Sequence, residues 1–344
     1  MFGCSRITGR QALVGAAGVA VAAVAAVAAT RRIQAIRGST SSPGTFRNEL
    51  LCTPSLQADV TEIRTDDGAT LHVRAYGPQD GEPIVLSHGW ACSHEYWYPQ
   101  VNALAGEYRV ITYDQRGHGR STVGSAAFGP DVLADDLSEV LKATVREDKK
   151  AVVVGHSMGG MSIMAWAGRY PEQVNRYASA ALLASTACDR LVADTTVIPL
   201  PNGFPRVPVP VGRAVMSASV PLVPSPVTTR ALQYAAMSQN ATPAEVQFCE
   251  SIVRDCDPRI RGGWGAALSG LDIHEALENL DVPTTVLVGS VDRLTPPVHS
   301  RRLARMLSDA GNLEHLVVLS DVGHMSSVEN VDEFNREIMH LRNL

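Results

Sequence analysis

The 344-residue sequence predicts an α/β fold: a mostly parallel central sheet with helices on both faces and an inserted helical, Pro-rich cap. From Asp59 onward, short apolar runs alternate with helical patterns. Continuous apolar runs are typical of strands buried on both faces, and the intervals between them are long enough for crossover helices. One long stretch breaks the alternation and contains no convincing strand, which indicates an insertion.

The first two expected strands form a hairpin. Val60–Arg64 and Leu71–Tyr76 flank Asp66-Asp67-Gly68, whose residue types favour a tight turn. Buried strands are expected to follow at Ile84–Ser87, Arg109–Tyr113, Ala151–Gly155, Ala180–Ala184, Thr285–Gly289 and His315–Leu319.

Helical patterns fall between these runs. Phe334, Ile338 and Leu341 recur at spacings of four and three, so they share one face of a helix. Helices are expected at Val132–Val145, Gly159–Arg169, Ser300–Leu307 and Val331–Leu341.

The cap is expected at residues 187–279. Within it, Ile198–Val227 carries eight of the twenty prolines of the chain. Neither a helix interior nor a central strand accepts proline at that density. The core is therefore expected in two parts, residues 59–186 and 280–344.

An apolar segment precedes this globule. Residues 12–29 contain only Ala, Val, Gly and one Leu, between Arg10 and the pair Arg31-Arg32. This length is near the minimum for a membrane-spanning helix. We expect residues 1–30 to anchor the chain in a membrane; the alternatives are a cleaved signal peptide, which would release a secreted protein, and a surface helix. Basic residues flank the segment on both sides, so they do not fix its orientation. Residues 31–58 are expected to be a linker.

Charge and cysteine content exclude several classes of protein. The net charge is −5, but residues 1–58 carry six Arg and one acid, Glu49, so the globule itself is acidic. With 45% hydrophobic residues and no acidic or basic block running through the chain, the protein is neither a disordered protein nor a dedicated nucleic-acid binder. The six Cys do not fit a disulfide framework or a CxxC metal site. Cys249 and Cys256 either pair in an oxidising compartment or are separate buried thiols.

The most informative motif surrounds Ser157. An apolar run leads directly into Gly155-His156-Ser157-Met158-Gly159, and a helical pattern follows. Glycines on both sides of the serine avoid clashes in a tight strand–turn–helix, which is the context of a nucleophile elbow. Ser157 is therefore the candidate nucleophile.

A serine nucleophile needs a base, and the base needs an orienting acid. His324 and Asp292 each lie in a loop just after an expected strand, at the edge where α/β proteins assemble their sites. We expect His324 to be the base and Asp292 the acid. Asp189 and Asp321 are the rival acids.

An ester-cleaving site also needs N–H groups directed at the oxyanion of the tetrahedral intermediate. The residue after the nucleophile, Met158, provides one backbone N–H. The loop His88-Gly89-Trp90 follows an expected strand, and the N–H of Trp90 is the expected second donor.

The sequence resembles the α/β-hydrolase superfamily, in its esterase and monoacylglycerol-lipase-like branch, from about residue 59 to 344. The matching features are His88-Gly89, Asp114–Ser121, the Ser157 elbow, Asp292 and His324. The resemblance also indicates that Asp114–Ser121 is a structural turn, so His118 is a poor candidate base. Haloalkane dehalogenases and epoxide hydrolases differ, since they use an aspartate nucleophile and often have proline where Ala91 stands.

The sequence thus predicts a serine hydrolase of carboxylic esters that works through an acyl-enzyme and needs no cofactor or metal. The expected partner is a small apolar ester, lipid-derived or of another kind; the oligomeric state is left open. The alternatives are thioester hydrolysis, C–C bond cleavage, perhydrolysis or an inactive binding module. His156 and the recurring Met158, Met161 and Met164 are expected to pack, and no zinc-ligand spacing occurs.

Overall fold

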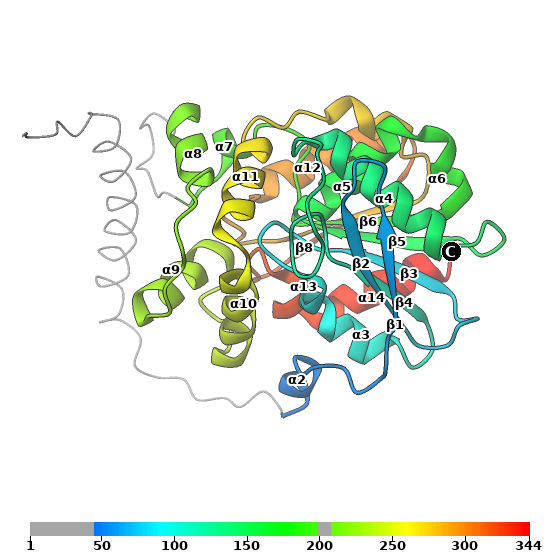
Figure 1. Ribbon diagram of the computed structural model, residues 1–344, viewed down its shortest axis with the longest axis horizontal. Coiled ribbons are helices and arrows are strands. Elements are labelled where there is room, and N and C mark those ends of the chain that lie inside the picture. Colours follow the sequence, from blue (N-terminus) through cyan, green and yellow to red (C-terminus); the bar gives the residue numbers. More distant parts are fainter. Residues whose placement is uncertain (1–44, 198–207) are drawn as a thin grey trace, which may run out of the picture.

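The computed structural model describes residues 45–197 and 208–344, and one eight-stranded sheet forms their centre (Figure 1). The strand order is β1-β2-β4-β3-β5-β6-β7-β8. The pairs β1/β2 and β2/β4 are antiparallel, and the remaining pairs are parallel. The strands are β1 (Asp59–Arg64), β2 (Thr70–Tyr76), β3 (Pro83–Ser87), β4 (Arg109–Tyr113), β5 (Ala151–His156), β6 (Ala178–Ala184), β7 (Thr284–Gly289) and β8 (Leu313–Leu319). The predicted α/β fold and its mostly parallel sheet are confirmed.

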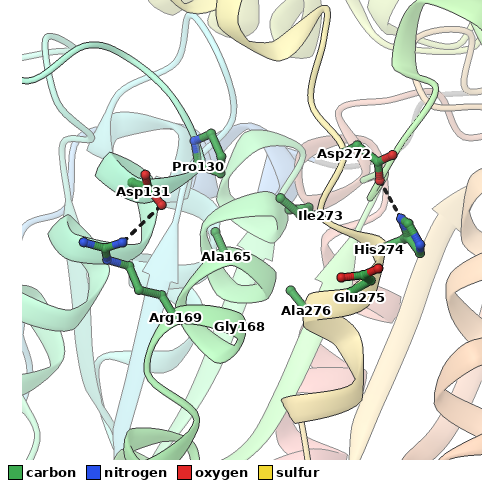
Figure 2. Close-up of a pocket in the computed structure, with 10 residues that line it drawn as sticks. All are labelled: Pro130, Asp131, Ala165, Gly168, Arg169, Asp272, Ile273, His274, Glu275 and Ala276. Carbon is green, nitrogen blue, oxygen red and sulfur yellow. Dashed lines mark hydrogen bonds and ion pairs between the residues drawn. The ribbon is translucent and has the colours of Figure 1, made fainter.

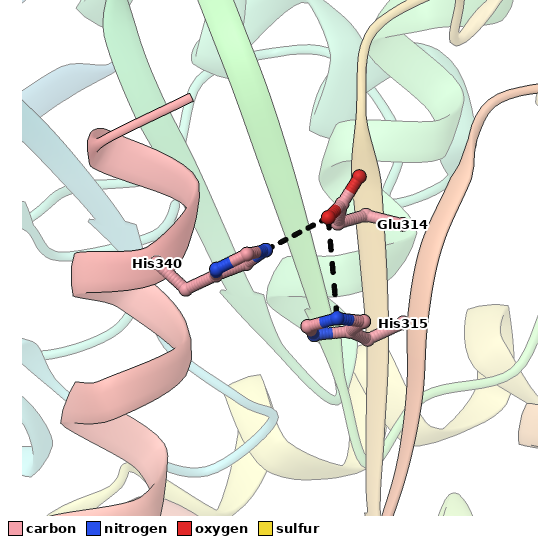
Figure 3. A group of neighbouring side chains, drawn as sticks. All are labelled: Glu314, His315 and His340. Carbon is pink, nitrogen blue, oxygen red and sulfur yellow. Dashed lines mark hydrogen bonds and ion pairs between the residues drawn. The ribbon is translucent and has the colours of Figure 1, made fainter.

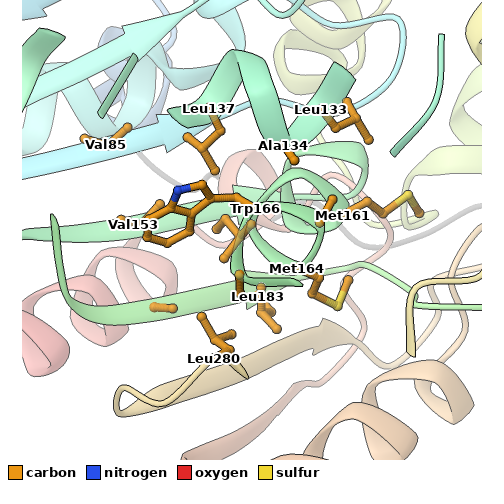
Figure 4. Close-up of a cluster of buried hydrophobic side chains, with 14 of the residues drawn as sticks. Val85, Leu133, Ala134, Leu137, Val153, Met161, Met164, Trp166, Leu183 and Leu280 are labelled. Atoms are coloured by element: carbon orange, nitrogen blue, oxygen red, sulfur yellow. The ribbon is translucent and has the colours of Figure 1, made fainter. Parts of the chain in front are cut away.

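Helices cover both faces of the sheet, and each face has its own hydrophobic core. Side chains alternate along β5: Val153 packs on the face of α4, α5 and α12, whereas Val152 and Val154 pack on the face of α3 and α14. In Figure 4, Trp166 of α5 lies between the sheet and Leu137 of α4. The helices of the core are η2 (His94–Trp97), α3 (Tyr98–Leu104), α4 (Pro130–Thr144), α5 (Met158–Arg169), α6 (Pro171–Tyr177), α12 (Pro297–Asp309), α13 (Ser326–Glu329) and α14 (Val331–Arg342).

The segment between β6 and β7, where the cap is expected, contains helices and no strand in its described part. Residues 198–207, in the Pro-rich stretch, lie outside the described residues. Two of its helices begin with a capping box, Ser225 with Thr228 and Thr242 with Glu245. The helices are α7 (Leu191–Asp194), α8 (Val209–Met216), α9 (Pro226–Ala236), α10 (Pro243–Asp255), α11 (Pro258–Leu268) and η3 (His274–Asn279).

The N-terminal expectations fall mostly outside the described residues. The expected anchor at residues 1–30 lies there, and none of the described helices could span a membrane. The expected linker, residues 31–58, contains a short helix, α2 (Thr45–Leu50). The chain after α2 is held against the core, because Asn102 Nδ2 donates hydrogen bonds to the carbonyl oxygens of Leu50 and Cys52 at 2.8 Å.

Candidate active site

Ser157 occupies a strained turn between β5 and α5. Its φ of 53° and ψ of −116° are unfavourable for a residue with a side chain. The neighbouring backbone holds the turn: Ser157 N–H donates to the Ala184 carbonyl at 2.9 Å, and Thr186 Oγ1 donates to the Ser157 carbonyl at 2.7 Å. The geometry is that of the expected nucleophile elbow.

The glycines of the motif are required by space. A Cβ on Gly155 would meet the Gly159 carbonyl, and a Cβ on Gly159 would meet the carbonyl oxygen of Ser87 in β3. A Cβ on Gly89 would likewise come within 3.2 Å of the Ser157 Cβ. Only glycine therefore lets the elbow and the His88-Gly89 loop approach each other this closely.

His324 and Asp292 lie together after the carboxyl ends of β8 and β7. The distance from His324 Nδ1 to Asp292 Oδ2 is 2.9 Å, and both residues are at least 96% buried. Asp292 Oδ1 accepts hydrogen bonds from the N–H groups of Leu294 and Thr295. The carboxylate therefore holds the His324 imidazole through Nδ1–H and leaves Nε2 as an acceptor.

The two rival acids have other surroundings. Asp189 forms an ion pair with Arg302 on α12. Asp321 is exposed, and its N–H donates to Ser290 Oγ. Of the three candidates, the structure brings Asp292 to His324.

Ser157 and His324 line one cavity of about 300 Å³. Its wall is largely apolar and comes from both the core and the expected cap, including Met161, Val192, Val215, Met216, Leu232, Val253, Leu268 and Leu294. Met161, which its spacing predicts to be a packing residue, thus also faces the cavity. A smaller hollow of about 140 Å³ adjoins it and shares Leu232 and Val253 with it.

Of the two expected oxyanion donors, Trp90 lines this cavity and Met158 directly follows Ser157 in the chain. Met158 is the first residue of α5, where the backbone N–H groups are unpaired within the helix. Trp90 lines the cavity, and its Nε1 donates to the Arg261 carbonyl of α11 at 2.9 Å. The Trp90 side chain thereby ties the His88-Gly89-Trp90 loop to the expected cap.

Buried neutral histidines fix this loop. His88 Nε2 accepts from the Gln115 N–H at 2.9 Å, and His118 Nε2 accepts from the Ala91 N–H at 3.2 Å. Burial lowers the pKa of His88 to about 4 and that of His118 to about 3. Both rings are therefore structural, as expected for His118 in the Asp114–Ser121 turn.

His156 also has a structural place, beneath the elbow. Its Nε2 lies 2.8 Å from the His324 carbonyl oxygen, and its ring stacks on Tyr96 at 4.6 Å. Burial lowers the pKa of His156 well below its usual range. The ring thus supports the backbone of His324, in agreement with the expectation that it packs.

Sequence reasoning missed two residues that hold the acid and the base. Thr295 Oγ1 donates to Asp292 Oδ2 at 2.8 Å; its spacing of three from Asp292 was the available signal. Glu329 Oε2 accepts from the N–H groups of Gly323, just before His324, and of Ser238 in the expected cap. Burial raises the pKa of Glu329 to about 7. No local pattern indicates this role.

A second hollow, of about 510 Å³, lies between α4, α5 and η3 (Figure 2). Four of its charged side chains form ion pairs, Asp131 with Arg169 and Asp272 with His274, and Glu275 also lines the hollow. It contains none of the residues expected at the active site.

A mostly parallel sheet with a strained serine after a central strand, and an Asp–His pair after the last two strands, is the architecture of an α/β hydrolase. The α/β hydrolase fold family matches residues 82–331. The chain therefore belongs to this family and is an enzyme of the α/β-hydrolase superfamily.

Curated relatives have several activities in their names. A non-heme chloroperoxidase of Streptomyces lividans is 29% identical over 68% of this chain and 83% of its own. The 3-oxoadipate enol-lactonase 1 of Acinetobacter baylyi is 29% identical over 79% of this chain and 92% of its own. These relatives support hydrolase chemistry but differ in substrate.

Solved structures agree on the fold. A thermophilic esterase from Thermogutta terrifontis matches with a TM-score of 0.64 and 23% identity, over 83% of this chain and 97% of its own. The enol-lactonase from Burkholderia xenovorans matches with the same TM-score and identity, over 80% and 97%. At this identity the likeness concerns the fold alone.

Proposed function

We propose that the protein is a serine hydrolase that cleaves carboxylic esters through an acyl-enzyme. One observation carries the proposal: a strained Ser157 shares a cavity with His324, whose Nδ1 is held by Asp292 at 2.9 Å. A serine is a weak nucleophile by itself, and this arrangement supplies the base that activates it.

In the proposed reaction, Ser157 Oγ attacks the ester carbonyl while His324 Nε2 takes its proton. The N–H groups of Met158 and Trp90 stabilise the negative oxygen of the tetrahedral intermediate. The C–O bond to the alcohol then breaks, and His324 returns the proton to the leaving alcohol. Water, deprotonated by His324, attacks the acyl carbonyl; the bond between the acyl carbon and Ser157 Oγ then breaks, Oγ takes the proton back from His324, and the acid is released. Asp292 stabilises the imidazolium in both steps.

The proposed substrate is an apolar ester. The cavity wall is mostly aliphatic, and Arg261 is the charged residue among its described lining. The adjoining hollow, which shares Leu232 and Val253 with the cavity, is also lined mostly by apolar side chains. An acyl chain that fills both would bury more apolar surface than a short one.

The test is turnover of nitrophenyl esters, together with covalent labelling by a fluorophosphonate. The wild-type protein should be labelled at Ser157, whereas Ser157→Ala should be neither labelled nor active. A folded Ser157→Ala variant that still turns over the ester would refute the assignment. A wild-type protein that is folded but not labelled would favour an inactive binding module.

A second candidate activity is perhydrolysis, in which hydrogen peroxide replaces water and the acyl group leaves as a peracid. The name of one relative favours it: a bifunctional esterase/perhydrolase of Acinetobacter calcoaceticus is 33% identical over 42% of this chain. Peracid production in the presence of ester and peroxide measures it directly. A panel of thioesters and diketones tests thioester hydrolysis and C–C cleavage in the same way.

We also propose that residues 12–29 attach the enzyme to a membrane, with secretion after cleavage as the alternative. The described cap surface supports contact with lipid, because it exposes Val209, Val211, Val220, Leu222, Val223 and Val227. Mass spectrometry of the mature N-terminus and membrane fractionation distinguish the two outcomes. An intact N-terminus on a protein that does not sediment with membranes would contradict both.

A further inference from the structure

A cluster of metal-ligating side chains lies at the edge of the sheet, apart from the cavity of Ser157. Glu314 and His315 on β8 and His340 on α14 each offer one ligand atom, and these three atoms lie within 4.8 Å of one another (Figure 3). Two imidazole nitrogens and a carboxylate oxygen are a ligand set that suits zinc. We propose that Glu314, His315 and His340 bind a Zn²⁺ ion, with water completing the coordination.

The local backbone brings these side chains together through a bulge in β8. Leu313 pairs with Thr284 and Leu316 with Val286, so β8 has one more residue than β7 over this interval. In a regular strand, Glu314 and His315 would point to opposite faces. One extra residue in a strand changes the direction in which a neighbouring side chain points.

Both side chains consequently reach α14. Glu314 Oε1 lies 2.8 Å from His340 Nε2, and His315 Nδ1 lies 3.0 Å from Glu337 Oε2. The bulge is a feature of the backbone pairing and does not depend on the side-chain types, and it lies at the two strand residues of the cluster, Glu314 and His315.

Glu337 gives the cluster a further feature of a metal site. Its carboxylate can accept the Nδ1–H of His315, which leaves the Nε2 lone pair of that ring available. Histidines that bind a metal usually donate their other N–H to such a partner. Glu337 and His340 are three residues apart on α14 and therefore lie on the same side of the helix. Glu337 is thus a positioning residue, not a ligand.

Small side-chain movements would complete the coordination. The rings of His315 and His340 are nearly parallel, with centroids 4.5 Å apart, and His315 Nε2 lies 3.9 Å from Glu314 Oε1. Ligand atoms around tetrahedral zinc are roughly 3.3 Å apart. The His315 side chain is 44% exposed, so it can turn towards the other two ligands without disturbing the core.

The ion would stabilise the fold and would not take part in ester cleavage. Glu314 and His315 lie at the amino end of β8, whereas His324 follows its carboxyl end. At about 3.3 Å per residue, the two ends of this strand are roughly 20 Å apart. The metal would tie an edge strand to the C-terminal helix.

Calorimetric titration of the full-length, tag-free protein with Zn²⁺ tests the proposal, with thermal unfolding as a second readout. We expect saturable binding of one ion at this site and a higher Tm in its presence. His340→Ala and Glu314→Gln should weaken binding by at least about tenfold, and Glu337→Gln should weaken it by a similar factor although it removes no ligand.

His274→Ala is the matched control. His274 is an exposed histidine paired with a carboxylate, Asp272, at 2.6 Å, but it has no third ligand beside it among the described residues. Its loss should leave zinc affinity unchanged, and Cys52→Ser excludes binding by the exposed thiol. Ester turnover shows that each variant is folded. Absence of saturable binding in the wild type, or unchanged affinity in His340→Ala, would overturn the proposal.

Discussion

Exchange of Asp292 for asparagine tests the proposed triad sharply, because the surroundings of this carboxylate determine how the new amide must lie. Oδ1 accepts from the backbone N–H groups of Leu294 and Thr295, both at 2.9 Å. These donors cannot turn away. In Asp292→Asn, the amide oxygen should therefore take the place of Oδ1, and the NH₂ group the place of Oδ2.

The NH₂ group would then face His324 Nδ1, which lies 2.9 Å from Oδ2 in the wild type. The imidazole would have to accept at Nδ1 and carry its proton on Nε2, so it could not take the proton of Ser157. A wrong tautomer of this kind lowers kcat by about 10⁴ in a serine triad. That factor corresponds to about 5 kcal/mol of activation free energy.

The assay is kcat for nitrophenyl acetate, with Tm measured on the same samples to show that the fold is intact. Asp321→Asn is the matched control, since it makes the same exchange three residues from His324 on an exposed side chain. It should change kcat less than threefold. If Asp292→Asn keeps kcat within tenfold of the wild type, with an unchanged Tm, the proposed role of Asp292 is wrong.

Three further predictions concern packing, pH and chain length. Gly159→Ala should destabilise the fold by about 1–3 kcal/mol in urea unfolding, because the added Cβ would meet the Ser87 carbonyl. Gly106 has open space around it, so Gly106→Ala should leave the unfolding free energy unchanged. Burial raises the pKa of Glu329 from 4.5 to about 7, so the folded protein keeps a proton that the unfolded chain releases in this range. The contribution of Glu329 to the unfolding free energy should therefore fall by about 3 kcal/mol from pH 4.5 to 7, whereas the buried neutral histidines contribute in the opposite direction. The unfolding free energy of the wild type minus that of Glu329→Gln should fall by this amount over the same range; a difference that stays constant with pH would contradict the prediction. Leu232→Trp should lower the ratio of kcat/KM for octanoate esters to kcat/KM for acetate esters about tenfold. A variant that loses kcat/KM equally for both esters would argue against a continuous acyl site.

Structural features that depend only on residues close together in the sequence were predictable. The first two strands follow from the turn between them and the other six from local apolar runs, and the observed bounds differ from the expected ones by two residues at most. The Ser157 elbow was predictable for the same reason, since its strand, glycines and helix are contiguous. Asp292 and His324 could be placed because parallel strands end at one edge of the sheet.

Features that depend on distant partners were not predictable. Glu329 accepts a hydrogen bond from the N–H of Ser238, which lies 91 residues earlier in the chain. The bulge that brings Glu314 and His315 to one side of β8 depends on pairing with β7, and the sequence contains no zinc-ligand spacing to reveal it. A local shift in strand register and hydrogen bonds between distant residues leave no periodic pattern in the sequence.

The surroundings of the ten histidines explain why His324 is the proposed base. A base in a triad needs a carboxylate on one ring nitrogen and a free second nitrogen that faces the substrate. His94 meets the first condition, because Asp114 Oδ1 lies 3.0 Å from His94 Nδ1. The second nitrogen of this ring, Nε2, is not free, since it lies 3.3 Å from Arg74 Nη1. His156 faces the cavity, yet its Nε2 is committed to the backbone of His324. Among the histidines, all of which lie in the described part of the chain, His324 alone combines a carboxylate at Nδ1 with a place in the wall of the cavity that Ser157 lines.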